Sequence, residues 1–257
     1  MCRMLGVIGQ NQVPAREWLD AFYPLCTQGR VKSTAKPGHL DGWGIAGYPH
    51  GQAVYYARRP LDASQDKEAW QNAVQQVDKH QSGTLIAHFR KASTGGNVRE
   101  NTHPFRKNGW FFCHNGTVYQ AEKLPLKKYT PEGQTDSERF FLFVLEAIER
   151  IGDPARGLME AIRSIRESCE YNSLTFILTD GKTLYTHRSF TDQRLETGET
   201  REEREGYYTL WTWQSGGNQG VCSEPIPGEK TSGWEKLSNG ALWVLSAAKP
   251  TQKEQIL

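Results

Sequence analysis

The chain opens with Met1-Cys2-Arg3-Met4-Leu5-Gly6-Val7-Ile8-Gly9, in which residues 4–9 have the composition of a buried strand. Cysteine is small enough for Met1 to be removed, which would leave Cys2 with both a thiol and a free α-amine. A thiol has a reference pKa of about 8.5 and a terminal amine one of about 8, so the amine can accept the thiol proton near neutral pH. Cys2 is therefore a candidate nucleophile with its own base, although an unreactive cysteine at the start of a strand fits this stretch equally well.

Length and composition limit the class of protein. With 257 residues and no linker rich in Pro, Gly or Ser, the chain is predicted to form a single domain over residues 1–257. Its 31 Lys and Arg residues nearly balance 29 Asp and Glu residues, and no basic stripe alternates with aromatic side chains. We therefore expect no nucleic-acid partner.

The sequence also indicates a compartment. The apolar stretch at residues 4–8 is too short for a signal peptide, and no run approaches the roughly 20 apolar residues of a membrane-spanning helix. The 5 cysteines are widely spaced, without a C-x-x-C pair, so they are predicted to be free thiols in a reducing environment. These features predict a cytoplasmic protein without membrane contact.

Hydrophobic periodicity predicts strands near both ends of the chain and two adjacent helices in the middle, an order typical of an α+β fold. Residues 191–206 are charged and nearly free of apolar side chains, which predicts an exposed and mobile loop. Hairpins are expected at Pro49-His50-Gly51 and at Asp180-Gly181. The expected helices cover residues 14–26, 62–80, 135–151 and 154–170, and the expected strands cover 4–9, the end of 39–47, 52–58, 84–89, 110–113, 173–179, 183–187, 207–213, the neighbours of Val221, and 242–246.

Two charged residues stand where they could bind the ends of an amino acid. Arg90 follows an apolar strand, a position from which its guanidinium could hold a carboxylate through two parallel hydrogen bonds. The alternative is a surface salt bridge. Asp136 lies in Thr135-Asp136-Ser137-Glu138, which has the spacing of a helix capping box. Its carboxylate could still point away from the helix and accept an ammonium group.

His114-Asn115-Gly116-Thr117 directly follows the strand predicted at 110–113. The Asn115 side-chain amide and the Gly116 backbone N–H are two neutral donors that a turn could direct at one point, as an oxyanion hole requires. Asn-Gly is also the commonest hairpin turn, so a purely structural role is the alternative.

These candidates together fit one class of substrate. A γ-glutamyl amide has an α-carboxylate for an arginine, an α-ammonium for a carboxylate, and an amide carbonyl for a nucleophile and two donors. Arg90, Asp136, Cys2 and the pair Asn115/Gly116 supply these groups in turn.

The order of the motifs also resembles the class II glutamine amidotransferase domain. That family belongs to the N-terminal nucleophile hydrolases, so the resemblance implies a four-layer αββα fold. The motifs span residues 2–138, and weaker likeness continues through 175–181 and 223–225. They are Cys-Arg-x-x-Gly at residues 2–6, Asp-Gly-Trp-Gly at 41–44, His-x-Arg-x-Ala-Ser at 88–93, Asn-Thr-His-Pro-Phe at 101–105, His-Asn-Gly at 114–116 and Thr-Asp-Ser-Glu at 135–138.

The resemblance assigns a role to each candidate residue. Cys2 is the nucleophile and its freed amine the general base, while Asn115 and Gly116 form the oxyanion hole. Arg90, supported by Ser93, holds the substrate carboxylate, and Asp136 holds the substrate ammonium. Water resolves the thioester, and neither a metal nor another cofactor is needed.

The chain departs from the better-known synthases of this family. Arg3, Lys91 and Thr94 stand where those enzymes commonly have Gly, Trp and His, which makes the pocket wall and the preference for glutamine open questions. No synthase domain follows in the sequence. We therefore weigh a free-standing hydrolase of glutamine or another γ-glutamyl amide, a glutaminase subunit that supplies ammonia to a separate synthase chain, and a non-catalytic domain that binds γ-glutamyl compounds or a protein.

A metal-dependent hydrolase is a further alternative, built on His88, His103 and His114. Their spacings match no compact ligand motif such as H-x-x-x-H. Cys113 and His114 are neighbours on a predicted strand, so their side chains should point to opposite faces. No metal site is expected.

Overall fold

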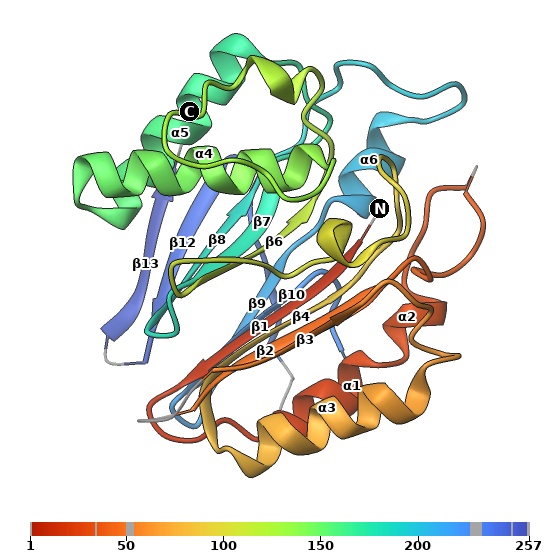
Figure 1. Ribbon diagram of the computed structural model, residues 1–257, viewed down its shortest axis with the longest axis vertical. Coiled ribbons are helices and arrows are strands. Elements are labelled where there is room, and N and C mark those ends of the chain that lie inside the picture. The colour runs from red at the N-terminus through yellow and green to blue at the C-terminus, as the bar shows by residue number, and fades with distance from the viewer. Residues whose placement is uncertain (1, 34, 50–53, 227–232, 248, 256–257) are drawn as a thin grey trace.

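Two antiparallel β-sheets lie face to face at the centre of the molecule, and helices cover the outer face of each sheet (Figure 1). The predicted four-layer αββα arrangement and α+β class are thus confirmed. The structure is a computed structural model that describes residues 2–33, 35–49, 54–226, 233–247 and 249–255.

The strands of the first sheet are β1 (Arg3–Gly9), β2 (Trp43–Pro49), β3 (Tyr55–Arg59), β4 (Ser82–Phe89), β9 (Trp211–Ser215), β10 (Asn218–Cys222) and β11 (Glu235–Lys236). Those of the second are β5 (Phe105–Lys107), β6 (Trp110–Asn115), β7 (Thr175–Thr179), β8 (Thr183–Arg188), β12 (Ala241–Ser246) and β13 (Lys249–Gln255). In the described residues their orders are β11-β9-β10-β1-β4-β2-β3 and β13-β12-β8-β7-β6-β5. β1 is therefore an interior strand, flanked by β10 and β4.

The side chains of β1 alternate between two apolar layers. Leu5 and Val7 belong to the core between the first sheet and its helices, whereas Met4 and Ile8 belong to the core between the two sheets. Successive side chains of a strand point to opposite faces. Cys2, just before β1, accordingly faces the second sheet, and the residue after it faces the helices.

Helices α1 (Ala15–Phe22), α2 (Leu25–Gln28) and α3 (Lys67–Lys79) cover the first sheet. The single helix predicted over 14–26 is wrong, because the chain divides at Pro24, which has no amide hydrogen to continue a helix. The helix predicted from residue 62 begins at Lys67. The preceding residues form a turn in which Oδ1 of Asp62 accepts a hydrogen bond from the Ser64 nitrogen at 2.8 Å.

Helices α4 (Asp136–Ile151) and α5 (Pro154–Ser168) cover the second sheet as an antiparallel pair (Figure 1). Most side chains of α4 are buried, as predicted, since they pack against both the sheet and α5. Gly152, with φ of 75°, ends α4, and Oδ1 of Asp153 caps α5 by accepting from the Arg156 nitrogen at 3.0 Å.

The segment after β8 differs most from its prediction. Residues 192–198 are exposed, but Arg201–Tyr207 form helix α6, so a loop over all of 191–206 is wrong. The strand predicted over 207–213 begins only at Trp211.

A buried ion pair explains this difference. Arg204 is fully buried and forms an ion pair with Glu199 at 2.5 Å. Its guanidinium also donates to the carbonyl oxygens of Thr191, Gln193 and Arg194. Charge content alone predicts a solvated loop. Here the charged side chains instead pair with each other and bind backbone carbonyl groups, and these contacts stabilise a folded segment.

The turns that connect neighbouring strands agree only in part with the hairpins that the sequence predicts. β7 and β8 form the predicted hairpin, with Gly181 at φ of 86°, but three residues rather than two join the strands. β2 pairs with β3 as expected, although residues 50 and 51 of the turn lie outside the described residues. β5, β11 and β13 are short or terminal strands that the sequence did not predict.

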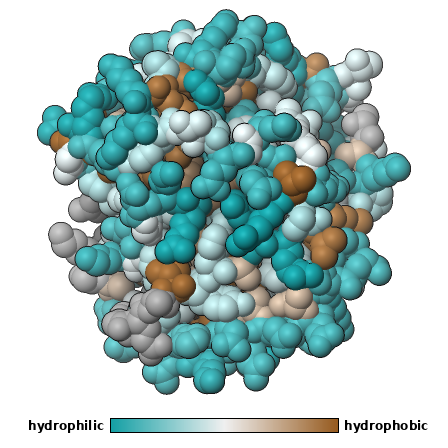
Figure 2. Space-filling model, in the orientation of Figure 1, coloured by the Kyte–Doolittle hydropathy of each residue, from teal (hydrophilic) through white to brown (hydrophobic). Residues whose placement is uncertain are grey.

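The face seen in Figure 2 is mostly hydrophilic, with apolar side chains in separate places. The large exposed apolar side chains of the described residues are Leu40, Leu61, Val98 and Leu195. Within the described ranges, no helix combines the length and the apolar character needed to cross a membrane.

Candidate active site

Cys2 lies where the start of β1 in one sheet meets the end of β6 in the other. Its side chain is 7% exposed, and its backbone nitrogen donates a hydrogen bond to Oδ1 of Asn115 at 3.0 Å. Its Sγ lies 3.8 Å from the carbonyl oxygen of Lys91, just after β4. The packing of the two sheets thus joins residues that are far apart in the sequence.

Only one end of the buried Asn115 amide is used. Oδ1 accepts from Cys2, whereas Nδ2 has no hydrogen-bond partner among the described residues. A buried donor without an acceptor costs about 1–3 kcal/mol, which a ligand that brings an acceptor would recover. Nδ2 can therefore donate to a negative oxygen that forms beside Cys2.

Gly116 follows directly and admits no side chain. A Cβ at this position would lie 2.0 Å from the carbonyl oxygen of Ser173. The hairpin-turn interpretation of Asn115-Gly116 is wrong, because Asn115 pairs with Thr175 inside the second sheet. Asn115 instead is the last residue of β6, and Gly116 follows it, at the end of the strand that lies next to Cys2.

His114, which also lines the space beside Cys2, supports this strand end. Its Nε2 lies 3.0 Å from the carbonyl oxygen of Ser173, and its Nδ1 lies 2.9 Å from Oγ of Ser137. A carbonyl only accepts, so Nε2 carries the hydrogen. Burial lowers the pKa of His114, although the Asp136 carboxylate acts in the opposite direction. The imidazole is therefore neutral, and it connects α4 and β6 to Ser173, two residues before β7.

Arg90 is 3% exposed, so the surface salt-bridge interpretation is wrong. Its guanidinium donates to the carbonyl oxygens of Thr94 at 2.9 Å and Gly96 at 3.3 Å, and to Oδ1 of Asn97 at 3.0 Å. The segment 94–97 is thereby folded around the arginine.

Two residues that the sequence analysis did not assign a role hold this segment. Oδ2 of Asp41 accepts from the Ala92 nitrogen at 2.8 Å. The fully buried Asn101 donates from Nδ2 to the Gly96 carbonyl at 3.1 Å and accepts at Oδ1 from the Gln134 nitrogen at 2.8 Å. Both residues belong to motifs noted above, but a motif does not reveal which of its members connects which segments.

Asp136 is the first residue of α4, and both of its carboxylate oxygens are engaged. Oδ2 accepts from the Val118 nitrogen at 2.7 Å, and Oδ1 accepts from Oγ1 of Thr94 at 3.1 Å. The exposed Ser93 accepts at Oγ a long hydrogen bond, 3.4 Å, from Oγ1 of Thr117. Thr94 therefore occupies the Asp136 oxygen that a ligand would need.

The predicted capping box is half formed. Oγ1 of Thr135 accepts from the Glu138 nitrogen at 3.2 Å, as expected. The Glu138 carboxylate, however, accepts from the nitrogens of Glu132 at 2.9 Å and Gly133 at 2.7 Å instead of turning back to Thr135. It thus fixes the segment that leads into Asp136.

A narrow cleft joins the predicted residues. Its lining includes Cys2, Arg90, Ser93, Gly116 and Asp136, with Asn115 held against Cys2. Its volume of about 20 Å³ suits about one water molecule, so it must open to admit an amino acid. A wider pocket of about 390 Å³ adjoins it and shares Thr94, Thr135 and Asp136.

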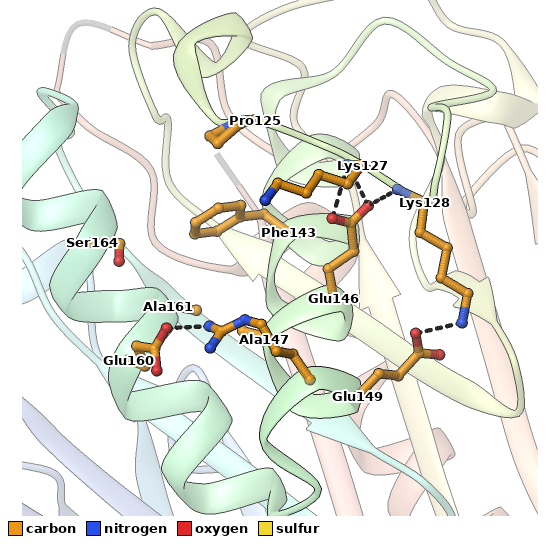
Figure 3. A pocket seen from close by; sticks show the side chains of 11 residues that line it. Pro125, Lys127, Lys128, Phe143, Glu146, Ala147, Glu149, Glu160, Ala161 and Ser164 are labelled. Carbon is orange, nitrogen blue, oxygen red and sulfur yellow. Dashed lines mark hydrogen bonds and ion pairs between the residues drawn. The ribbon is translucent and has the colours of Figure 1, made fainter.

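A larger groove, of about 490 Å³, lies between the segment 125–128 and helices α4 and α5 (Figure 3). Glu146 accepts there from the Lys127 nitrogen at 2.9 Å, and Glu149 forms an ion pair with Lys128 at 2.7 Å. The described lining of this groove includes no cysteine, and these carboxylates are already paired, so the cleft at Cys2 is the better candidate.

His88 and His103 stack beside the cleft, with ring centroids 4.2 Å apart. Burial lowers the pKa of both imidazoles well below the usual range, so both are neutral at neutral pH. Among the described residues, no group of three or more His, Cys, Asp or Glu side chains is arranged to hold a metal ion.

Lys91 and Thr94 line the cleft, whereas Arg3 does not. The expectation that Arg3 alters the pocket wall is therefore wrong. It fails because strand alternation turns Arg3 away from the face that carries Cys2.

Comparison with known proteins places these features in context. Residues 1–201 match the class-II glutamine amidotransferases. An uncharacterised protein of Methanocaldococcus jannaschii is 30% identical over 261 residues, which cover 95% of this chain and 69% of that protein.

Two solved structures share the fold. A glutamine aminotransferase class-II domain protein from Silicibacter pomeroyi superposes with a TM-score of 0.66 at 21% identity, covering 99% of both chains. Glutamine phosphoribosylpyrophosphate amidotransferase from Bacillus subtilis gives a TM-score of 0.65 at 15% identity, covering 100% of this chain and 49% of that one.

Proposed function

The chain belongs to the class II glutamine amidotransferases, a family of amide-hydrolysing enzymes with the N-terminal nucleophile hydrolase fold, and on that premise we propose that it hydrolyses a γ-glutamyl amide through a thioester on Cys2. Glutamine is the simplest such substrate. The observation that carries the proposal is the divided role of Asn115, whose Oδ1 holds the Cys2 nitrogen while its buried Nδ2 has no partner in the part of the chain that the structure describes.

Removal of Met1 frees the α-amine of Cys2, which keeps its hydrogen bond to Oδ1 of Asn115. The amine accepts the thiol proton, and the thiolate attacks the amide carbon. The carbonyl oxygen becomes an oxyanion and accepts from Nδ2 of Asn115 and the Gly116 N–H. Collapse of this intermediate breaks the C–N bond, and the leaving amine takes the proton from the α-ammonium. Water then attacks the thioester, with the same amine as base.

The α-carbon end of the substrate binds on the other side of the cleft. Its ammonium displaces the Thr94 hydroxyl from Oδ1 of Asp136, and its carboxylate replaces part of the backbone acceptor set of Arg90. Both exchanges release the segment 94–97, which explains how so small a cleft admits an amino acid. Ser93, directly before this segment, supports the carboxylate.

Mass spectrometry of the intact protein tests the proposal, before and after incubation with the glutamine-shaped alkylating agent 6-diazo-5-oxo-L-norleucine. We expect loss of Met1 and one adduct that maps to Cys2, with none in Cys2→Ala. Cys113→Ala is the matched control and should be labelled like the wild type. Retained Met1, or an adduct on Cys113 or Cys169, would contradict the nucleophile assignment.

A second experiment, an ammonia-release assay, separates free-standing from partner-dependent activity. Ammonia release from L-glutamine by the purified chain supports independent hydrolysis, with L-asparagine as the negative control. A protein that is labelled at Cys2 but releases no ammonia from L-glutamine would require another γ-glutamyl amide or a separate synthase subunit.

A further inference from the structure

Arg3, the residue after the nucleophile, is buried on the face of β1 opposite the cleft. Its side chain is 1% exposed, and its Nη1 donates to the carbonyl oxygen of Cys2 at 2.9 Å. Burial of an arginine is costly unless its charge is compensated and its donors are used. The contact with the Cys2 carbonyl therefore belongs to a built site.

Three other segments complete this site. Glu224, after β10, forms an ion pair with Nε of Arg3 at 2.5 Å and also accepts from the Arg30 nitrogen at 2.7 Å. Nη2 of Arg3 donates to the Arg30 carbonyl. The guanidinium carbon lies 4.7 Å from the ring centre of Tyr207 in α6. Arg3 thus connects the nucleophile to the segment after α2, to the end of β10 and to α6.

We propose that Arg3 is a positioning residue for Cys2, one that fixes the backbone of the nucleophile and by its charge favours the neutral, proton-accepting form of the freed α-amine. This inference rests on the proposed function. Glu224 sets the strength of the effect, because its carboxylate partly offsets the arginine charge.

The distances support an electrostatic effect. Within one residue the backbone nitrogen and carbonyl oxygen are at most about 3.6 Å apart, so Nη1 of Arg3 lies within about 6.5 Å of the Cys2 nitrogen. A positive charge at this separation disfavours a second positive charge on the amine. In a buried site the amine would therefore lose its proton at a lower pH than it would without Arg3.

Other charged and titratable groups also surround Cys2. On the cleft side they come from the end of β4, the segment before β5, the end of β6 and the start of α4; behind Arg3 they come from β10 and α6. They are, in that order, His88, Arg90 and Lys91, His103, Cys113 and His114, Asp136, Glu224 and Tyr207. Single substitutions at Arg3 and Glu224 leave the cleft-side groups unchanged, so opposite effects of the two substitutions isolate the contribution of Arg3.

The test measures kcat/KM for L-glutamine across the acid limb of the pH profile. In Arg3→Gln the amine gains a proton more readily, so the acid limb should move up by about one pH unit and activity near neutral pH should fall up to about tenfold. Arg3→Lys keeps the charge and should restore the limb. Glu224→Gln removes the offsetting carboxylate and should move the limb down.

Arg204→Gln is the matched control, because it also removes a buried, ion-paired arginine, but one whose partner is Glu199. It should destabilise the protein without moving the acid limb. Limbs that stay in place or move in the same direction in Arg3→Gln and Glu224→Gln would overturn the inference. If Arg3→Gln does not fold, the acid limbs of Arg3→Lys and Glu224→Gln still test the inference. Failure of the proposed function gives a different result from failure of this inference, because glutamine hydrolysis would then survive in Cys2→Ala.

Discussion

The layer between the two sheets has two ends of different character. Over most of its length it is dry, with Met4, Ile86 and Ile177 packed in one apolar cluster. At the end where β1 begins, the same layer contains Cys2 and Asn115, and here the buried Nδ2 of Asn115 has no hydrogen-bond partner among the described residues. Because successive side chains alternate between the two faces of a strand, residues at both ends of this layer point into it. Whether such a residue takes part in catalysis or only in packing therefore depends on its position along the strand. A buried donor without a hydrogen-bond partner lowers the stability of the folded state. The position of this donor beside a thiol therefore indicates a function.

The largest effect should come from replacing Cys2, compared with replacing Cys113 of the apolar cluster. Cys2→Ala removes the nucleophile and should lower kcat for L-glutamine by about a thousandfold or more, with little change in the free energy of unfolding. Cys113→Ala, in the apolar cluster of this layer, should retain kcat and lose about 1 kcal/mol of stability through a small cavity. Steady-state kinetics and urea unfolding measure both quantities. Equal kinetic losses in the two variants would remove the distinction between the ends.

Asn115→Asp sharpens the assignment of the polar end. The variant keeps an oxygen for the Cys2 nitrogen but replaces the Nδ2 donor by a second acceptor, so kcat should fall about 100- to 1,000-fold. Asn172→Asp is a suitable control, because that side chain accepts at Oδ1 from the Thr117 nitrogen at 2.7 Å outside the cleft. It should affect kcat far less. A fully active Asn115→Asp would show that no oxyanion relies on Nδ2.

How much of this contrast the sequence could predict depends on the kind of contact. The apolar composition of residues 4–9 and of the strand before Asn115 is a local pattern that predicted both strands, and the candidates Cys2 and Asn115 stand at the ends of these strands. The bond between Cys2 and Asn115 joins two sheets, so it depends on how the sheets pack. The burial of Arg3 and the helix built around Arg204 were missed because charge content predicts exposure unless the partner is known. Asp41 was missed because it acts through the backbone of another segment.

A cavity made in the apolar part of the layer also tests the comparison between the dry end and the polar end. Ile177 of β7 faces Gly6 of β1, where an added Cβ would lie 3.2 Å from Cγ2 of Ile177. Ile177→Ala should therefore lower the free energy of unfolding by about 3 kcal/mol, since the two sheets cannot collapse fully onto the space. The kcat of the folded fraction should stay close to that of the wild type. A kinetic loss comparable to that of Asn115→Asp would mean that the dry end also controls the site.

The smallest effect concerns pH, because the polar end contains His88 and His103 in neutral form. Burial lowers the pKa of both, whereas in the unfolded chain each titrates near its usual value of about 6.5. Below that value the unfolded state binds protons that the folded state does not, so stability falls as pH decreases. Each such histidine should cost about 2 kcal/mol between pH 7 and about pH 5. His187, whose pKa burial lowers to about 4, gives the same effect in the outer layer.

Urea unfolding at neutral and mildly acidic pH separates these histidines. His187→Gln and His88→Gln should each reduce the loss of stability on acidification by about one histidine's share. The ring nitrogens of His88 have no hydrogen-bond partner within the described ranges, so His88→Gln should cost less stability at neutral pH than His187→Gln, which loses the bond between Nδ1 and the Ala241 carbonyl at 2.9 Å. The reverse order would show that the polar end is as tightly specified as the layers around it.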